Sequence, residues 1–243
     1  MWARRTHPPP SDRSQAVELV VSADPEEAAA EVARLLVDVA TEGGSVVLAG
    51  GSTPRRAYEL AAAAQPYWGD VDIWFGDERC VPADDPRSNL QLVRESFLKE
   101  LVVWPRVHPI PIELPAAEAA EAYDAVLQGV KLDLVVLGLG ADGHTASLFP
   151  EAPALDVVDR LVVEAEAGLE PFVDRVTLTI PALEAGAHVV FLAVGTEKAE
   201  PARRAFGEKA SRATPASLVR SRLGTTTAIL DRAAASLLRP SSS

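Results

Sequence analysis

The architecture of the chain can be inferred from one segment, Leu134-Val135-Val136-Leu137-Gly138-Leu139-Gly140-Ala141-Asp142-Gly143-His144. The largely apolar run 132–137, with its β-branched residues, predicts a strand that is buried on both faces of a sheet. Glycines follow it, where a side chain would hinder a sharp turn. Asp142 and His144 emerge from that turn. We therefore expect both at the carboxyl edge of the sheet, which is where open α/β folds bind ligands.

Strands and helices alternate along the rest of the chain, which predicts a three-layer α/β fold with a mostly parallel sheet. The polar segment 76–82 is predicted as a turn, and a short helix is predicted after the last strand. The expected strands cover residues 17–21, 45–49, 71–75, 132–137, 160–164, 175–179, 189–194 and 227–230. The expected helices cover residues 24–41, 55–64, 89–101, 116–128 and 197–206.

Composition narrows the possible functions. Of the 243 residues 48% are hydrophobic, which is enough for a substantial core, but no run of 18 apolar residues predicts a membrane span. The net charge of −12 disfavours a general binder of nucleic acid or acidic membranes, because phosphate backbones require clustered Lys and Arg. Cys80 is the only cysteine, which excludes an internal disulfide and fits the cytoplasm. The segment 1–15 lacks the apolar block of a secretory signal and is predicted to be a disordered tail.

The glycines of the first motif also match the dinucleotide-binding fingerprint G-x-G-x-x-G, at Gly138, Gly140 and Gly143. That fingerprint requires a long helix directly after the glycines, because the helix aims its amino end at the pyrophosphate. Pro150 and Pro153 interrupt any such helix within about two turns. A nicotinamide or flavin site is therefore disfavoured.

A second motif, Gly50-Gly51-Ser52-Thr53-Pro54, follows the expected strand 45–49. Its glycines permit close approach of a ligand, Ser52 or Thr53 is suited to cap the next helix, and Pro54 suits the first helical position. The free amides of such a helix end, with two hydroxyls, form a natural phosphate site. An ordinary, well-capped turn requires the same residue types, so both interpretations remain open for this motif alone.

A third motif, Gly76-Asp77-Glu78-Arg79, follows the expected strand 71–75. Adjacent carboxylates point in different directions, so we expect one of them to face the site. Arg79 is then either a clamp for an anion or the partner of the other acid. A solvated, charged turn is the alternative.

Taken together, the three motifs resemble those of the 6-phosphogluconolactonases. The resemblance implies the fold shared with glucosamine-6-phosphate deaminases, a single Rossmann-like α/β domain over residues 16–238 with a tail at 239–243. It also implies hydrolysis of 6-phospho-D-glucono-1,5-lactone in the oxidative pentose phosphate pathway. Further matching blocks are Val81-Pro82, Ser88-Asn89, Thr145-Ala146-Ser147-Leu148-Phe149-Pro150, Arg175-Val176-Thr177-Leu178-Thr179 and Gly195-Thr196-Glu197-Lys198-Ala199.

Lactone hydrolysis suggests catalytic roles for three residues. Water must attack the carbonyl carbon, and the ring oxygen must leave with a proton. His144 is the candidate base, because an unperturbed histidine pKa of about 6.5 leaves much of the ring neutral at cellular pH. Either Asp142 or Asp77 is expected to orient this ring or to bind sugar hydroxyls. No cofactor is expected, and the scattered histidines and single cysteine show no spacing typical of a metal site.

The phosphorylated substrate is expected to bind through local positive charge and exposed backbone. The resemblance puts Arg175 and Lys198 beside Ser52 and Thr53 at the phosphate. Lys198 would lie in the first turn of a helix, which is unfavourable for a cation unless an anion is nearby. Arg79 is a further candidate. The other residues expected to bind substrate are Gly50, Gly51, Gly140 and Gly143.

Two other functions remain as alternatives. In the deaminase/isomerase branch the motif equivalent to 142–150 looks like D-G-H-I-A-F-N-E-P, whose glutamate falls at Phe149 of this chain. A phenyl ring neither titrates nor accepts a charge-assisted hydrogen bond, and this favours the lactonase. The second alternative is a sugar-phosphate sensor without catalysis. No partner is expected beyond a small phosphorylated sugar lactone, in a monomer or small homo-oligomer.

Overall fold

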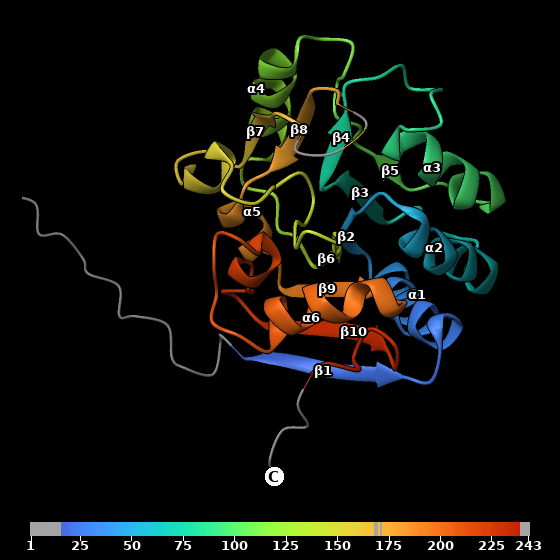
Figure 1. Cartoon of the computed structure of the whole chain (residues 1–243). Helices are drawn as coiled ribbons and strands as arrows, with labels where there is room; N and C mark the ends of the chain where they lie inside the picture. The colour runs from blue at the N-terminus through green and yellow to red at the C-terminus, as the bar shows by residue number, and fades with distance from the viewer. Residues whose placement is uncertain (1–15, 168–169, 171, 239–243) are drawn as a thin grey trace, which may run out of the picture.

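The computed structural model describes residues 16–167, 170 and 172–238, so the tails predicted at 1–15 and 239–243 lie outside it. A parallel sheet of seven strands crosses the molecule in the order β1-β10-β9-β6-β2-β3-β5 (Figure 1). Its central strands are almost fully buried, as the apolar runs predict. The strands are β1 (Val17–Ser22), β2 (Gly44–Leu48), β3 (Val71–Phe75), β5 (Arg106–Val107), β6 (Leu134–Gly138), β9 (His188–Ala193) and β10 (Thr225–Asp231).

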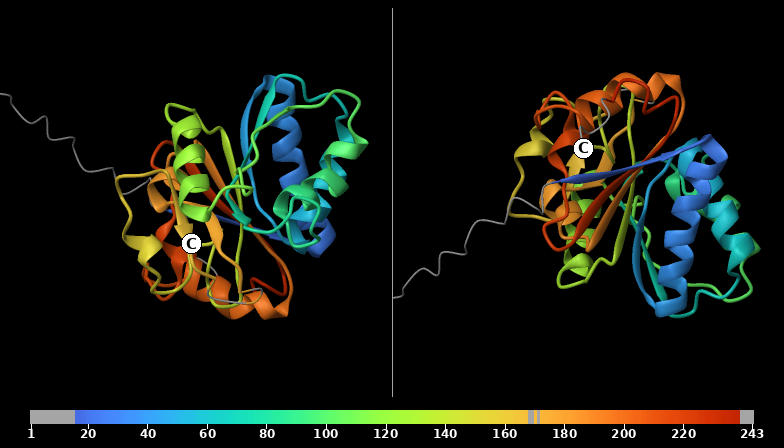
Figure 2. Two further views of the ribbon diagram at one scale, coloured as in Figure 1. Left: turned by 90° about the horizontal axis from the view of Figure 1, so that it is seen from above. Right: turned by 90° about the horizontal axis from the view of Figure 1, so that it is seen from below.

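Helices lie on both sides of this sheet, which confirms the three-layer architecture (Figure 2). On one side lie α1 (Pro25–Glu42), α2 (Ser52–Ala64) and α3 (Asn89–Ser96), and α1 packs on β10 and β2. On the other side lie α4 (Ala116–Leu127) and α6 (Ala199–Phe206). A shorter helix, α5 (Ile180–Glu184), precedes β9. None of the helices in the described residues is long and apolar enough to cross a membrane.

A second, antiparallel sheet was not anticipated. It contains β4 (Asp77–Arg79), β8 (Arg175–Leu178) and β7 (Val162–Ala165), in that order. The predicted turn at 76–82 is therefore wrong over its charged triplet, and the strands expected at 160–164 and 175–179 do not join the parallel sheet. Only Gly76 separates β3 from β4, so the chain passes directly from one sheet to the other.

Several element boundaries also differ from expectation. The helix expected over 89–101 ends at Ser96, and a 3-10 turn η2 (Leu98–Glu100) follows, because Phe97 is non-helical (φ −134°) and packs edge-on against Trp68 at 4.7 Å. The two-residue strand β5, which has prolines nearby on either side, was not predicted. The short helix expected after the last strand is instead a series of turns. Further 3-10 turns are η3 (Pro153–Asp156), η4 (Thr196–Lys198) and η5 (Pro215–Leu218).

The order of the parallel strands creates a crevice between β2 and β6. From β2 the chain continues to β3 and β5 on one side, whereas from β6 it continues to β9 and β10 on the other. The loops that leave β2 and β6 therefore diverge at the carboxyl edge of the sheet. Open α/β sheets bind ligands at such a switch point, and the two glycine motifs of this chain lie there.

Candidate active site

A cavity of about 260 Å³ opens at the carboxyl ends of β2, β6 and β9. Ten of the twelve predicted site residues line it, although they come from distant parts of the chain. The other two, Asp142 and Gly143, lie in the loop behind His144. The predicted residues at the wall are Gly50, Gly51, Ser52, Thr53, Asp77, Arg79, Gly140, His144, Arg175 and Lys198.

His144 and Asp142 form a hydrogen-bonded pair at one wall of the cavity. Oδ1 of Asp142 lies 2.5 Å from Nδ1 of the His144 ring, and it also accepts the His144 backbone N–H at 3.0 Å. Burial opposes the charge on Asp142, but the hydrogen bonds from His144 outweigh it and lower the pKa of this carboxyl. The carboxylate thus fixes the ring through Nδ1, which leaves Nε2 for a ligand or water.

The glycines of this loop are required by its close packing. A Cβ at Gly140 would lie 2.1 Å from Nδ1 of His144 and 2.7 Å from Oδ1 of Asp142. Gly143 has φ +97°, a conformation that L-residues rarely adopt, and Thr214 packs against it. Glycine at both positions therefore allows the acid and the ring to approach each other.

Of the two acids considered, Asp142 is the one that bonds to the His144 ring. Asp77 forms no hydrogen bond with His144. The carboxylate of Asp77 accepts a hydrogen bond from Oγ of Ser147 at 2.6 Å and another from the side-chain amide of Asn89 at 2.9 Å. It is only 6% exposed and borders the cavity. Asp77 is therefore placed to meet a ligand at the wall of the cavity.

Glu78 points away from the cavity, as expected for one of two adjacent acids. Its carboxylate accepts backbone N–H groups of Asn89 and Leu90 at 2.8 Å each, at the amino end of α3. Burial raises the pKa of Glu78 in spite of these hydrogen bonds. The role of this acid is to hold α3 against β4, where its charge complements the helix dipole.

The amino end of α2 points its backbone at the cavity, but its capping differs from the prediction. The helix begins at Ser52, and its N-cap is Gly51 (φ +105°), with no side-chain hydrogen bond to the cap. Pro54 is accordingly the third helical residue. Ser52 and Thr53 line the cavity instead of capping the helix, which leaves their hydroxyls beside the backbone amides that a phosphate would contact.

Three cationic side chains surround the same space. Arg175 is 5% exposed, and burial together with the nearby charge of Arg79 lowers its pKa. Arg79 donates to the backbone carbonyl of Arg87 at 2.7 Å and to Oδ1 of Asn89 at 2.6 Å. Lys198 lies at the start of α6, as predicted. Three positive charges at one wall of the cavity are suited to an anion such as a phosphate.

Comparison with known proteins agrees with this geometry. Residues 11–228 match the family described as glucosamine-6-phosphate isomerases/6-phosphogluconolactonase. The chain belongs to this family. The 6-phosphogluconolactonase of Homo sapiens is 40% identical over 206 residues, 79% of either protein. The solved 6-phosphogluconolactonase of Trypanosoma brucei is 29% identical with a TM-score of 0.79, over 93% of this chain and all of that one. A monomeric glucosamine-6-phosphate deaminase, at 19% identity and a TM-score of 0.77, shares the fold.

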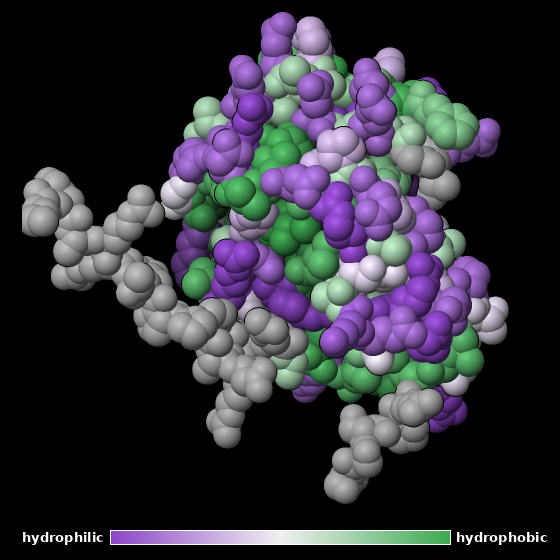
Figure 3. Space-filling model, turned by 60° about the vertical axis from the view of Figure 1, so that its left-hand side comes forward, coloured by the Kyte–Doolittle hydropathy of each residue, from purple (hydrophilic) through white to green (hydrophobic). Residues whose placement is uncertain are grey.

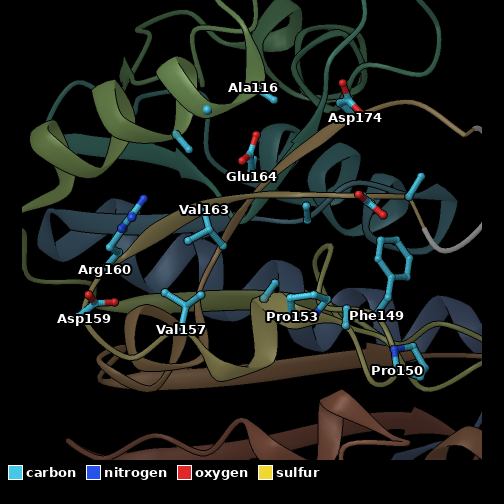
Figure 4. Close-up of a pocket in the computed structure, with 17 residues that line it drawn as sticks. Ala116, Phe149, Pro150, Pro153, Val157, Asp159, Arg160, Val163, Glu164 and Asp174 are labelled. Carbon is cyan, nitrogen blue, oxygen red and sulfur yellow. The ribbon is translucent and has the colours of Figure 1, made fainter.

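A larger cavity, of about 720 Å³, is a poorer candidate for the active site of a family that handles sugar phosphates (Figure 4). Alanine, proline and valine line most of it, and its charged side chains include Asp159, Glu164 and Asp174 but only one base, Arg160. Figure 3, which brings forward the side where α4 and β7 lie in Figure 1, shows hydrophobic side chains gathered in a hollow with a hydrophilic rim. Acids and apolar walls do not favour an anion.

Phe149 separates the two cavities. It lines the larger one, and its ring centroid lies 5.0 Å from that of His144. The guanidinium of Arg175 lies over the same ring at 5.7 Å. This is the position at which the deaminase branch of the family is expected to carry a glutamate. No carboxylate of residue 149 is therefore available beside His144.

The remaining histidines and Cys80 lie elsewhere. His108 contacts Asp72 at 2.7 Å and stacks on Trp74, and His188 contacts Thr227 at 2.9 Å. His7 is outside the described residues. Burial raises the pKa of Cys80, which lines a third cavity and not the one at His144. Among the described residues, no group of three or more His, Cys, Asp and Glu is placed to hold a metal ion.

Sequence reasoning missed some residues that support the site. Asn89 and Ser147 bond to Asp77. Arg204 of α6 donates to the backbone carbonyls of Ala141 and Asp142, at 3.3 and 3.2 Å, and so holds the loop that carries Asp142 and His144. Asn89 and Ser147 belong to the blocks that resemble the family, which was the only available signal. Nothing in the sequence distinguished Arg204 from Arg203, the other arginine of its helix.

Proposed function

We propose that the chain hydrolyses 6-phospho-D-glucono-1,5-lactone to 6-phospho-D-gluconate, the second step of the oxidative pentose phosphate pathway. The observation that carries this proposal is the combination of an oriented histidine with a cationic pocket: His144, held by Asp142 behind it, borders the same cavity as the three cations. Family membership and the names of the relatives support the same activity. The single cysteine supports a site of action in the cytoplasm.

In the proposed mechanism, His144 is the general base. Nε2 takes a proton from a water molecule whose oxygen attacks the lactone carbonyl carbon. The tetrahedral oxyanion collapses, the bond between this carbon and the ring oxygen breaks, and His144 returns the proton to the leaving oxygen. Asp142 keeps Nδ1 protonated and stabilises the imidazolium that forms between the two proton transfers. Asp77, which also lines the cavity, would orient sugar hydroxyls.

The phosphate is proposed to bind at the amino end of α2. Ser52, Thr53 and the amides after Gly50 and Gly51 would donate to its oxygens, and Arg175 and Lys198 would neutralise its charge. Arg79 would contact either the phosphate or the lactone oxygens. The short side chains of this loop allow the backbone to approach the ligand closely.

The test is turnover of freshly generated lactone, corrected for its spontaneous opening and run with and without EDTA. Ammonia release from glucosamine 6-phosphate is assayed in parallel. We expect lactone turnover without ammonia, and no effect of EDTA. Ammonia release would instead assign the chain to the deaminase branch. The presence of Phe149 argues against that assignment.

The variant His144→Ala distinguishes the lactonase from the sensor alternative. We expect catalysis to fall by about a hundredfold or more while 6-phosphogluconate binding largely survives. The binding is measured by titration calorimetry. Unchanged turnover would remove His144 from the mechanism, and binding without turnover in the unaltered protein would support a sensor.

A further inference from the structure

Asn89 is a buried residue that connects two walls of the active site without lining the cavity. Its side chain is 0% exposed at the first position of α3. Nδ2 donates to the backbone carbonyl of Asp77 at 2.7 Å and to its carboxylate at 2.9 Å. Oδ1 accepts from Nη1 of Arg79 at 2.6 Å. One amide therefore bonds both the acid and the cation that β4 presents to the cavity.

The same amide packs against the glycine loop after β2. A Cβ added at Gly50 would lie 1.8 Å from Oδ1 of Asn89, so the loop backbone and the amide are in close contact. The loop, Asp77 and Arg79 are three separate parts of the cavity wall. Their relative positions thus depend on one side chain from a helix outside the cavity.

Charge explains why an amide is suited to this place. Asp77 and Arg79 are two residues apart on a strand, so their side chains share a face. Opposite charges in this arrangement tend to pair with each other. An amide has a donor end and an acceptor end, and it satisfies both charges while remaining neutral. Both side chains thus remain at the cavity wall, where a polar ligand meets them.

We propose that Asn89 is a positioning residue for the lactonase reaction, which holds Asp77 and Arg79 apart and against the Gly50 loop. This inference rests on the proposed function, because the substrate is what the positioned groups would bind. It assigns Asn89 no contact with substrate. Its effect on turnover must therefore pass through Asp77 and Arg79.

Ser88 provides a matched control on the same helix end. It is the N-cap of α3, where its Oγ accepts the Gln91 N–H at 3.2 Å and donates to Glu78 at 3.0 Å. It is as buried as Asn89 but bonds to neither Asp77 nor Arg79. Ser88→Ala should loosen α3 without releasing the two site residues, and so it measures what a merely structural defect costs.

The experiment compares Asn89→Ala with Ser88→Ala, in the unaltered chain and in a chain that already carries Asp77→Ala and Arg79→Ala. In the unaltered chain we expect Asn89→Ala to lower kcat/KM by about 10- to 100-fold. Ser88→Ala should change it by less than about twofold at a comparable melting temperature. In the doubly substituted chain, Asn89→Ala should have little further effect, because the groups it positions are gone.

Either of two results would overturn the proposal. One is an equal loss of kcat/KM in Asn89→Ala and Ser88→Ala. The other is an equal loss from Asn89→Ala in the unaltered and in the doubly substituted chain. We also measure binding of 6-phosphogluconate to the same variants by calorimetry. This measurement distinguishes a failure of the positioning proposal from a failure of the proposed function. Weaker binding in Asn89→Ala alone would support positioning even if the unaltered protein did not turn over lactone. Neither turnover nor binding in the unaltered protein would overturn both.

Discussion

At the scale of single residues, the site depends on glycines, because a side chain at these positions would overlap a neighbouring group. Gly140 has no side chain where a Cβ would overlap the His144 ring, and Gly50 has none where it would overlap Asn89. These contacts determine how closely His144 approaches Asp142 and how closely α3 approaches the Gly50 loop. Small changes at these positions should therefore act on catalysis before they act on the fold.

Gly140→Ala tests this dependence. The new methyl group would displace the ring from Asp142, so we expect kcat to fall by about a hundredfold while the circular dichroism spectrum is unchanged. Gly76→Ala is the control, since Gly76 lies outside the cavity and the nearest atom to a Cβ there is 3.5 Å away, and it should retain activity within a few-fold. Equal activity of the two variants would show that the close approach at Gly140 has no catalytic importance.

Ala146 is a second residue-scale case, because it lines the cavity with a left-handed backbone at φ +49°. This conformation costs a residue with a Cβ about 1 kcal/mol relative to glycine. We expect Ala146→Gly to leave stability unchanged or to raise it by up to about 1 kcal/mol in urea unfolding. Ala30→Gly, at an exposed position inside α1, should lower it by about 1 kcal/mol. A clear loss of stability in Ala146→Gly would mean that the methyl contacts outweigh the strain.

At the scale of elements, the apolar strands could be predicted and the charged ones could not. β6 and β9 are apolar runs buried on both faces, and their sequence shows it. β4 is the triplet Asp-Glu-Arg, which is typical of an exposed turn. Its two acids are nevertheless buried, and each of them finds a hydrogen-bond partner on α3. Its ladder partner β8 lies about 100 residues later, so no local pattern could show the pairing. The sequence located the loops of the site but not the residues that support them, because those contacts also join segments far apart in the chain.

The short edge strand β5 illustrates how side chains stabilise an element with few ladder bonds. Arg106 of β5 donates to Asp72 of β3 at 2.6 and 2.9 Å, and His108 contacts the same carboxylate at 2.7 Å. The hydrogen bond from Arg106, with that from His108, lowers the pKa of Asp72 although partial burial opposes it. A lowered pKa means that this contribution is present above the ordinary aspartate pKa of about 4 and is lost as the pH falls through the folded value.

Asp72→Asn should therefore lower the free energy of unfolding at pH 7, and the difference from the unaltered protein should shrink below about pH 4. Urea unfolding at pH 7, 5 and 3 measures it. In an Arg106→Ala background the same substitution should cost less, because the principal partner is missing. A difference that did not vary with pH would contradict an ionic origin.

At the scale of the whole molecule, the chain is strongly acidic but concentrates positive charge at one cavity. Its net charge is −12, yet Arg79, Arg175 and Lys198 border the same space. The first part of the chain contributes the amino end of α2, and the second contributes the histidine and two of the cations. Only the strand order brings these parts together, and the sequence alone does not specify which strands are neighbours.

Lys198→Ala tests this local charge. We expect KM for the phosphorylated lactone to rise about tenfold or more, because a charge-assisted hydrogen bond contributes about 1.5–3 kcal/mol, with little change in kcat. Lys209→Ala removes one positive charge from an exposed position outside the cavity and should leave KM unchanged. Equal effects of the two substitutions would indicate a response to net charge only.

The pairing of β1 with β10 affects how the protein folds during its synthesis. Residues 17–22 form an edge strand, and within the described part of the chain its neighbour in the sheet is residues 226–231, about 200 residues later. During translation, residues 17–22 remain without this partner until residues 226–231 have left the ribosome. Such a long separation in sequence slows folding and prolongs the exposure of an unpaired edge. The nascent chain is therefore open to association at this segment until β10 has been synthesised.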